Sequence, residues 1–336
     1  MGMGQKQVEV LIVGGGLAGL SAAIYLGRAR RDTLVVDVAK SMARWEPAVQ
    51  NYLGFPAGVS GAELLRRGRR QARRYGVRFL IDRVVKAAQQ NGSFTLKGER
   101  NSYRARRLLL ATGIFHIPPD IPGVAPCLGR SMFFCKDCDG YRVRGKSVAI
   151  YGWTNETVEY ALAMLLYSAC VAVVTDGRSG RWDKRHAEWL KEYKVPVYHQ
   201  RIMDVRRRGG RLRALLLSGA AVVEVDALFT TRGDLYRNEL ARGLGARMDR
   251  EGQVLVDEDM RTSVPGLYAA GCVTPANCQM IIAAGQGAIA AQAVNRELLN
   301  ESLATHSLRQ FRRRQLRTRR TRPRMVRRNE VSGRQK

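Results

Sequence analysis

Cysteine, histidine and long apolar runs are all scarce in this chain. Six cysteines among 336 residues are too few for a secreted scaffold held together by disulfides. The four histidines are not arranged as ligand pairs, so no metal site is expected. The chain has no run of about 18 consecutive apolar residues, which excludes a membrane-spanning helix. The N-terminal residues lack the layout of a signal peptide, so we expect a cytoplasmic protein.

Acidic residues are few relative to basic ones. The chain carries 57 Lys and Arg against 29 Asp and Glu, which gives a net charge of +28. Residues 305–336 hold thirteen basic residues and one acidic residue, Glu330. Such a surface favours an acidic protein, a nucleic acid or an anionic lipid as partner. A GC-rich genome, which favours arginine, would explain the same composition without any partner.

Two strand–helix–strand units predict the fold. The first has an apolar strand over Val8–Val13, a helix over Leu17–Arg28 and a strand over Leu34–Asp37. A second unit of the same kind covers residues 147–176, with its helix at 156–166 and its last strand at 171–176. Together these units predict two dinucleotide-type domains.

Further apolar segments follow in the sequence. Strands are predicted over residues 108–113 and 266–271, and a helix over residues 279–300. Apolar periodicity fades after Asn300, so the arginine-rich tail is predicted to be either disordered or a short basic helix.

Gly14, Gly16 and Gly19 form a G-x-G-x-x-G motif between the first strand and the first helix. The first glycine permits a tight turn, the second lets the backbone approach a pyrophosphate, and the third permits close helix–strand packing. The helix N-terminus then offers free N–H groups to the phosphates. Asp37 ends the next strand, where its carboxylate can accept hydrogen bonds from a ribose. The motif therefore predicts dinucleotide binding.

Cys135 and Cys138 form a C-x-x-C pair, which can close a disulfide across a short loop and lowers the pKa of one thiol. A metal site would need two further ligands that the sequence does not supply, and an unreactive buried pair is the other alternative. We favour a redox dithiol. Asp139 is a candidate proton carrier beside the pair, or else a turn or helix cap.

The second unit has lost its phosphate chemistry. Its turn keeps Gly152, but Trp153 and Thr154 replace the bare backbone that a phosphate would approach. Glu156 places negative charge near the helix N-terminus, and Asp176 would repel the 2′-phosphate of NADP. We therefore expect no tight binding of NADPH or NADH.

Six segments, in this order, resemble the low-molecular-weight thioredoxin reductases over about residues 7–300: GGGLAG, NYLGFP, LLLATG, CKDCDG, VDEDMRTSVPGLYAAG and QMIIAAGQGAIAA. The resemblance implies an α/β fold with two Rossmann-like, three-layer dinucleotide-binding domains, the second inserted in the first. It also implies FAD as cofactor and a homodimer. The implied domains are an FAD-binding domain made of residues 1–116 and 246–300, an inserted, degenerate pyridine-nucleotide-type domain of residues 117–245 that carries the C-x-x-C, and a basic tail of residues 301–336.

Site residues are carried over from the resemblance. Cys135 is expected to attack the substrate disulfide, Cys138 to lie next to the flavin, and Asp139 to act as acid or base. The residues implied to bind the cofactor are Gly14, Gly16, Gly19, Asp37, Asn51, Val84, Ala111, Thr112, Gly113, Gly271, Cys272, Gln279 and Met280.

Two further cysteines depart from the family pattern. Cys272 stands where the family usually has an aspartate, and Cys278 where it usually has an arginine. We expect two semi-buried thiols acting as small apolar residues; the alternative is an extra redox pair near the flavin. Together with the altered second unit, these departures resemble the pyridine-nucleotide-independent branch of the family, in which ferredoxin supplies the electrons.

The favoured function is an FAD-dependent disulfide oxidoreductase. It would pass electrons from ferredoxin, or another acidic donor, through FAD and the Cys135–Cys138 disulfide to thioredoxin. The alternatives are an NADPH-dependent thioredoxin reductase, a relative with a second flavin in the degenerate site, and a dithiol oxidase. A basic flavoprotein that binds nucleic acid or an anionic surface belongs to a different class. Nucleic acid is not expected as partner, because Phe311 is the sole aromatic residue of the tail.

Overall fold

The computed structural model describes residues 7–231 and 233–318. Contacts divide the chain into two compact parts, Met1–Ala293 and Val294–Lys336. The first part contains the sheets that the structure describes and all of the predicted site residues. The second contains the end of a long helix and the basic helix α8 (Ser307–Thr318).

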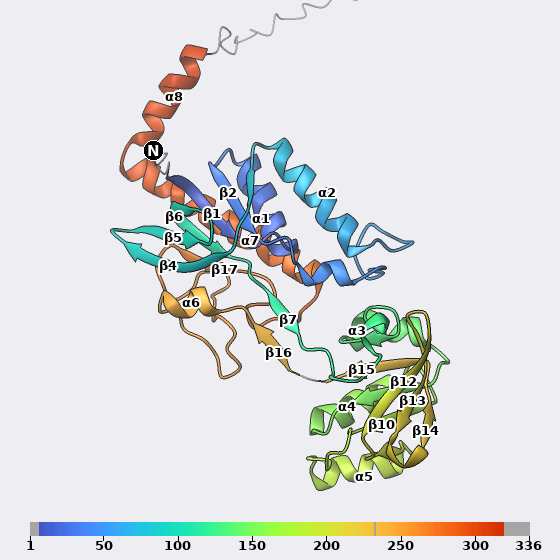
Figure 1. The fold of residues 1–336 in the computed structure, drawn as a ribbon. Coiled ribbons are helices and arrows are strands. Elements are labelled where there is room, and N and C mark those ends of the chain that lie inside the picture. The colour runs from blue at the N-terminus through green and yellow to red at the C-terminus, as the bar shows by residue number, and fades with distance from the viewer. Residues whose placement is uncertain (1–6, 232, 319–336) are drawn as a thin grey trace, which may run out of the picture. The chain divides into compact units, whose positions relative to one another are not determined.

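In the described part of the chain, the first sheet has seven strands in the order β3-β2-β1-β6-β5-β4, with β17 paired to β6 (Figure 1). Strands β3, β2, β1, β6 and β17 pair in parallel. Strand β5 pairs antiparallel with β6, and β4 pairs antiparallel with β5. Buried on both faces, the first strand needs an apolar run, as the sequence predicts. The strands are β1 (Val8–Val13), β2 (Thr33–Asp37), β3 (Arg78–Ile81), β4 (Val84–Gln90), β5 (Ser93–Gly98), β6 (Ser102–Leu110) and β17 (Leu267–Ala269).

Three helices accompany this sheet: α1 (Leu17–Arg28), α2 (Gly61–Arg74) and α7 (Met280–Ala304). Helices α1 and α2 lie side by side. The hydroxyl of Ser60 caps α2 by accepting a hydrogen bond from the N–H of Glu63 at 3.2 Å. A Cβ at Gly287 would lie 2.0 Å from the backbone oxygen of Ala18, so α7 and α1 touch backbone to backbone. This contact places the first half of α7 against the start of α1, next to the N-terminal glycine loop.

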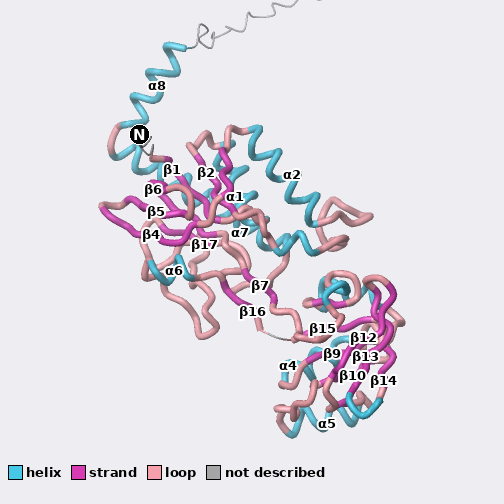
Figure 2. Tube along the Cα trace, viewed as in Figure 1, coloured by secondary structure: helices cyan, strands magenta, loops and turns pink. Residues whose placement is uncertain are grey.

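The chain leaves the first sheet through β7 (Ile114–His116) and returns through β16 (Asp234–Tyr236), which pair antiparallel (Figure 2). The sequence predicts that the inserted domain ends at residue 245, which comes after β16 in the chain. Leu240 and Ala241, on α6 (Glu239–Gly243), pack into the core of the first sheet. We therefore propose β7 and β16 as the two crossings of an inserted domain.

Between the crossings lies a second parallel sheet, with strand order β11-β10-β9-β15-β8 in the described residues. A three-stranded antiparallel sheet, β12-β13-β14, shares an apolar core with it. The strands are β8 (Met132–Phe133), β9 (Val148–Tyr151), β10 (Val171–Val174), β11 (Val197–Tyr198), β12 (Ile202–Arg208), β13 (Arg211–Leu217), β14 (Val222–Glu224) and β15 (Ala227–Thr230). The helices in this region are α3 (Lys136–Asp139), α4 (Asn155–Met164) and α5 (Lys184–Glu192), with 3-10 turns η2 (Ala125–Cys127), η3 (Gly140–Val143) and η4 (Ser218–Ala220). The 3-10 turn η1 (Met42–Trp45) lies before the first crossing.

Two Rossmann-like sheets, the first mixed and the second parallel, confirm the predicted fold class, while some boundaries differ. Strand β6 begins at Ser102, six residues before the predicted strand, because antiparallel pairing with β5 extends it. Strand β10 ends at Val174 rather than at residue 176, since Asp176 has a φ of +53° and turns the chain.

In the described part of the basic tail, α7 runs to Ala304, residues 305–306 turn the chain, and α8 covers Ser307–Thr318. Helix α8 agrees with the short basic helix that was one of the two predictions. The rest of the predicted tail, residues 319–336, lies outside the described residues. Over residues 7–231 and 233–318, none of the helices combines the length and apolarity needed to cross a bilayer.

Candidate functional site

A cavity of about 470 Å³ lies at the carboxyl ends of β1, β2 and β6. Ligands of open α/β sheets bind at this edge. The predicted site residues that line the cavity are Gly14, Gly16, Asp37, Asn51, Val84, Ala111, Thr112, Gly113, Cys135, Cys138, Asp139, Gly271, Cys272, Gln279 and Met280. Gly19 is the predicted residue that does not line it. The fold thus gathers segments that are far apart in the sequence around one space.

The glycine loop requires glycine for two measurable reasons. Gly14 has a φ of +109°, and a Cβ there would lie 2.2 Å from the backbone oxygen of Ala111. A Cβ at Gly19 would lie 2.0 Å from the backbone oxygen of Gly14. Helix α1 begins without a side-chain cap at Gly16, and Gly14, Gly15 and Gly16 all line the cavity. The loop therefore fits the pyrophosphate of a dinucleotide cofactor.

Asp37 lies at the end of β2 on the wall of this cavity, where the prediction places a ribose. Its Oδ2 accepts a hydrogen bond from Nη2 of Arg69 at 2.9 Å. A Cβ at Gly15 would lie only 2.6 Å from the same Oδ2. Gly15 is thus a site residue that the G-x-G-x-x-G spacing does not single out, because the constraint comes from a side chain on the next strand.

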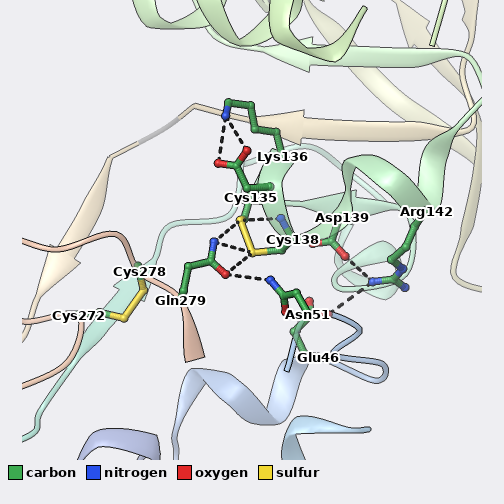
Figure 3. The surroundings of a disulfide bond; sticks show 11 residues. Glu46, Asn51, Cys135, Lys136, Cys138, Asp139, Arg142, Cys272, Cys278 and Gln279 are labelled. Carbon is green, nitrogen blue, oxygen red and sulfur yellow. Dashed lines mark hydrogen bonds and ion pairs between the residues drawn. A yellow bond between two sulfur atoms is a disulfide. The ribbon is translucent and has the colours of Figure 1, made fainter. Parts of the chain in front are cut away.

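Cys135 and Cys138 form a disulfide, called here the redox disulfide, with their Cα atoms 5.3 Å apart. It spans the first turn of the short helix α3, where the N–H of Cys138 points at Sγ of Cys135 at 3.1 Å. The Nε2 of Gln279 lies 3.3 Å from both sulfur atoms. The Oε1 of Gln279 accepts a hydrogen bond from Nδ2 of Asn51 at 3.0 Å (Figure 3). Three distant segments therefore converge on one disulfide beside the cavity.

A cluster of two carboxyl groups and one guanidinium lies beside the redox disulfide. Asp139 is only 4% exposed, and its Oδ1 accepts a hydrogen bond from Nη1 of Arg142 at 2.5 Å. The same Nη1 lies 3.5 Å from Oε2 of Glu46 (Figure 3). Arg142 thus bridges the two acids, and its guanidinium also stacks over the ring of Phe133.

Burial controls the protonation of this cluster. It raises the pKa of Asp139, while the charge and the hydrogen bond of Arg142 oppose the increase. Burial, with the nearby charge of Asp139, raises the pKa of Glu46 to about 7, and Arg142 again opposes it. Near neutral pH the cluster can therefore hold a proton next to the redox disulfide.

Glu46 and Arg142 were not predicted from the sequence. Arg142 follows Asp139 by three residues, a spacing at which side chains on a helical turn meet, so a local signal was present. Glu46 has no such signal, because it comes from the segment after η1 and meets the cluster only in the folded chain.

Cys272 and Cys278 form a second disulfide, with their Cα atoms 5.0 Å apart. The expectation of two separate thiols acting as small apolar residues is therefore wrong. The physical reason is the loop between β17 and α7, which folds back on itself and brings the two residues within bridging distance. Of the remaining cysteines, Cys127 is a buried free thiol and Cys170 an exposed one.

In the second unit, the turn after β9 satisfies its own polar groups. The N–H of Thr154 donates to Oγ1 of Thr157 at 3.2 Å, in a capping box at the start of α4. The guanidinium of Arg178 stacks over the indole of Trp153 at 3.9 Å from the ring centre. The turn that would cradle a phosphate in a nucleotide-binding domain is therefore occupied by the chain's own side chains.

Asp176 is engaged in the same way at the end of the neighbouring strand. Its Oδ2 accepts a hydrogen bond from the hydroxyl of Tyr151 at 3.1 Å, and its Oδ1 accepts one from the N–H of Ile202 at 2.8 Å. A carboxylate held here leaves negative charge where a 2′-phosphate would need a cation.

Comparisons with known proteins agree with this site. Residues 8–292 match the family model described as pyridine nucleotide-disulphide oxidoreductase. The thioredoxin reductase of Treponema pallidum (strain Nichols) is 31% identical over 298 residues, covering 86% of this chain and 96% of that relative. The crystal structure of HlmI has a TM-score of 0.85 at 28% identity, covering 91% of this chain and 97% of that one. Thioredoxin reductase from Giardia duodenalis has a TM-score of 0.79 at 25% identity, covering 88% and 100%.

The first prediction concerns the glycine loop. We expect Gly19→Ala to abolish flavin retention and to lower the free energy of unfolding by about 3 kcal/mol, because its Cβ meets backbone rather than a side chain that can move. Flavin absorbance after gel filtration and urea unfolding measure the two effects. The matched control is Gly285→Ala on α7, where a Cβ meets nothing within 4 Å. Normal flavin content in Gly19→Ala would contradict the geometry.

The second prediction concerns pH. The raised pKa of Glu46 means that the folded chain keeps its proton between about pH 4.5 and 7, where the unfolded chain has lost it. This group therefore contributes stability at low pH that is lost as the pH rises to about 7. Glu46→Gln should remove this loss, so its stability relative to wild type should increase from pH 5 to pH 8 in urea unfolding. The exposed Glu258→Gln serves as control. An unchanged difference at both pH values would mean that Glu46 titrates normally.

Proposed function

Because the chain belongs to the pyridine nucleotide-disulphide oxidoreductase family, and within it to the thioredoxin reductases, we propose that it reduces the disulfide of a thioredoxin with electrons from an acidic protein donor of the ferredoxin type. It is a flavin-dependent oxidoreductase that binds FAD. One observation carries the proposal: the redox disulfide lies against Gln279 on the wall of the cavity formed by the glycine loop.

Different residues around the cavity would bind different parts of the cofactor. The glycine loop would hold the pyrophosphate, and Asp37 the ribose. Bound there, FAD supplies the electron pair that converts the redox disulfide into a dithiol. Gln279 and Asn51 orient the disulfide through their shared hydrogen bond.

The dithiol then acts by thiol–disulfide exchange. The Cys135 thiolate attacks one sulfur of the thioredoxin disulfide, which breaks that bond and releases the other sulfur as a thiolate that takes up a proton. The Cys138 thiolate next attacks Sγ of Cys135 in the mixed disulfide. This step re-forms the redox disulfide and releases the second thioredoxin sulfur, which also takes up a proton. The electron pair has then moved to thioredoxin, and the enzyme's two cysteines are oxidised again.

Asp139 supplies the proton-handling group for these steps. Its burial and its raised pKa favour a carboxyl that holds a proton at its oxygen longer than an exposed aspartate does. Arg142 limits the shift and fixes the orientation of the carboxyl through the 2.5 Å hydrogen bond. Glu46 adds a second carboxyl within reach of the same guanidinium.

The occupied turn of the second unit supports a donor other than NADPH. The Trp153–Arg178 stack and the Thr154–Thr157 capping box use the groups that a pyrophosphate would need. The net charge of +28 supports an acidic protein instead, because opposite charges steer association. The homodimer implied by the family resemblance stays a prediction.

The third prediction tests the donor. We expect reduced ferredoxin to bleach the flavin absorbance rapidly in an anaerobic stopped-flow experiment, and micromolar NADPH to do so far more slowly. Steering should be lost between about 0.1 M and 1 M salt, as the Debye length falls from about 10 Å to about 3 Å. The ferredoxin rate should then drop by about tenfold or more.

A truncation provides the matched comparison for the donor test. Deletion of residues 305–336 removes thirteen basic residues and one acidic residue. It should lower the ferredoxin rate and flatten its salt dependence while leaving the flavin content unchanged. Fast bleaching by NADPH would overturn the donor proposal and leave an ordinary NADPH-dependent enzyme.

The fourth prediction separates the two redox cysteines. Cys138→Ser should retain FAD, lose turnover, and form a mixed disulfide between Cys135 and thioredoxin, because the chain has no second thiolate at this site to resolve it toward reduced thioredoxin. Cys135→Ser should retain FAD but form no such adduct. Non-reducing gels and mass spectrometry detect the adduct, and Cys170→Ser controls for the exposed free thiol. Donor-coupled turnover by Cys138→Ser would show that the redox centre lies elsewhere.

A further inference from the structure

The second disulfide, Cys272–Cys278, lies on the same cavity as the redox disulfide. Cys272 follows β17, and Cys278 immediately precedes Gln279, whose amide contacts both sulfur atoms of the redox disulfide. Figure 3 shows the two disulfides on either side of Gln279. The described residues thus place two cysteine pairs around a single cavity that fits a flavin.

The loop closed by the second disulfide is held in place without it. The N–H of Gly271 donates to Oε1 of Gln286 at 2.7 Å, and the N–H of Thr274 donates to the backbone oxygen of Gly271 at 2.9 Å. Nε2 of Gln253 donates to the backbone oxygen of Thr274 at 3.3 Å, and Val273 is fully buried. A bridge between residues six positions apart restricts the unfolded chain less than one that closes a longer loop. The hydrogen bonds and the burial of Val273 therefore hold this loop without need of the bridge.

The two residues of this disulfide differ in exposure. Cys278 is exposed, whereas Cys272 is half-buried. An exposed sulfur can be approached by an attacking thiolate, and exposed disulfides are the reducible ones as a class. Both cysteines line the cavity, and the more exposed Cys278 is thus the point of attack, with Cys272 as the leaving group.

We propose that Cys272–Cys278 is a second redox-active disulfide, which takes an electron pair from a dithiol and stores it beside the cavity. A thiolate of the dithiol attacks Sγ of Cys278, the Cys272–Cys278 bond breaks, and Cys272 leaves as a thiolate that takes up a proton. The second thiol of the reductant then attacks the mixed disulfide and releases Cys278, which also takes up a proton. The dithiol loses two electrons and two protons and becomes a disulfide, and the two cysteines gain them. This site goes beyond the proposed function and does not depend on it.

The test uses the FAD-loaded protein in three forms: wild type, C135S/C138S and C272S/C278S. Each is equilibrated without denaturant in glutathione buffers of graded reduced-to-oxidised ratio, trapped with N-ethylmaleimide and mapped by mass spectrometry. Cys127 and Cys170 give the background of free thiols. In C135S/C138S, we expect Cys272 and Cys278 to change together from unlabelled to fully labelled across the series. In an anaerobic dithionite titration, wild type should take up one electron pair more per chain than C272S/C278S.

Two results would overturn the proposal. Labelling of Cys272 and Cys278 only after unfolding in guanidinium would mean that the bridge is not reduced in the folded protein and has a structural role. Full labelling in the most oxidising buffer would mean that the bridge does not form. If C272S/C278S folds poorly, C135S/C138S still carries the test, since it retains the second disulfide. Because C135S/C138S lacks the redox disulfide, its result is independent of whether the chain reduces thioredoxin.

Discussion

The contact between the Gln279 amide and the redox disulfide is the interaction on which the site depends. Its nitrogen lies 3.3 Å from both sulfur atoms, and its oxygen accepts a hydrogen bond from Asn51. These residues come from a loop of the first sheet, from the region between the two crossings, and from the start of α7. One amide group therefore sets where the disulfide stands relative to the glycine loop, and electron transfer requires that proximity.

Electrostatics play opposite parts at the surface and in the site. The chain as a whole is strongly basic, which suits attraction of an acidic partner at long range. Beside the redox disulfide, two carboxyl groups share one guanidinium in a partly dehydrated setting. There burial raises the pKa of Asp139 and of Glu46, and this effect outweighs the opposing charge of Arg142. In the proposed function, the basic surface would favour encounter with the donor, and the buried acids would handle the proton.

The strand–helix–strand unit of residues 147–176 keeps its fold although its turn carries side chains where phosphate binding uses bare backbone. Its parallel strands and the helix after β9 keep Rossmann geometry, because that geometry depends on buried apolar residues. Phosphate binding depends instead on bare backbone in one turn, and Trp153 and Thr154 remove it. Fold and ligand specificity thus rest on different residues.

Local patterns in the sequence determined the elements, the glycine loop, the C-x-x-C pair and the side chains that stand in the turn of the second strand–helix–strand unit. Each of these rests on neighbouring residues, such as an apolar run or a fixed spacing. Tertiary structure alone decided three other features: the requirement for glycine at Gly15, the contact of Glu46 with Arg142 beside Asp139, and the bridge between Cys272 and Cys278. In each case the partner is set by how the chain folds back, either from another element or across a loop. Sequence spacing fixes what a residue can do locally, and only the folded backbone fixes which residue it meets.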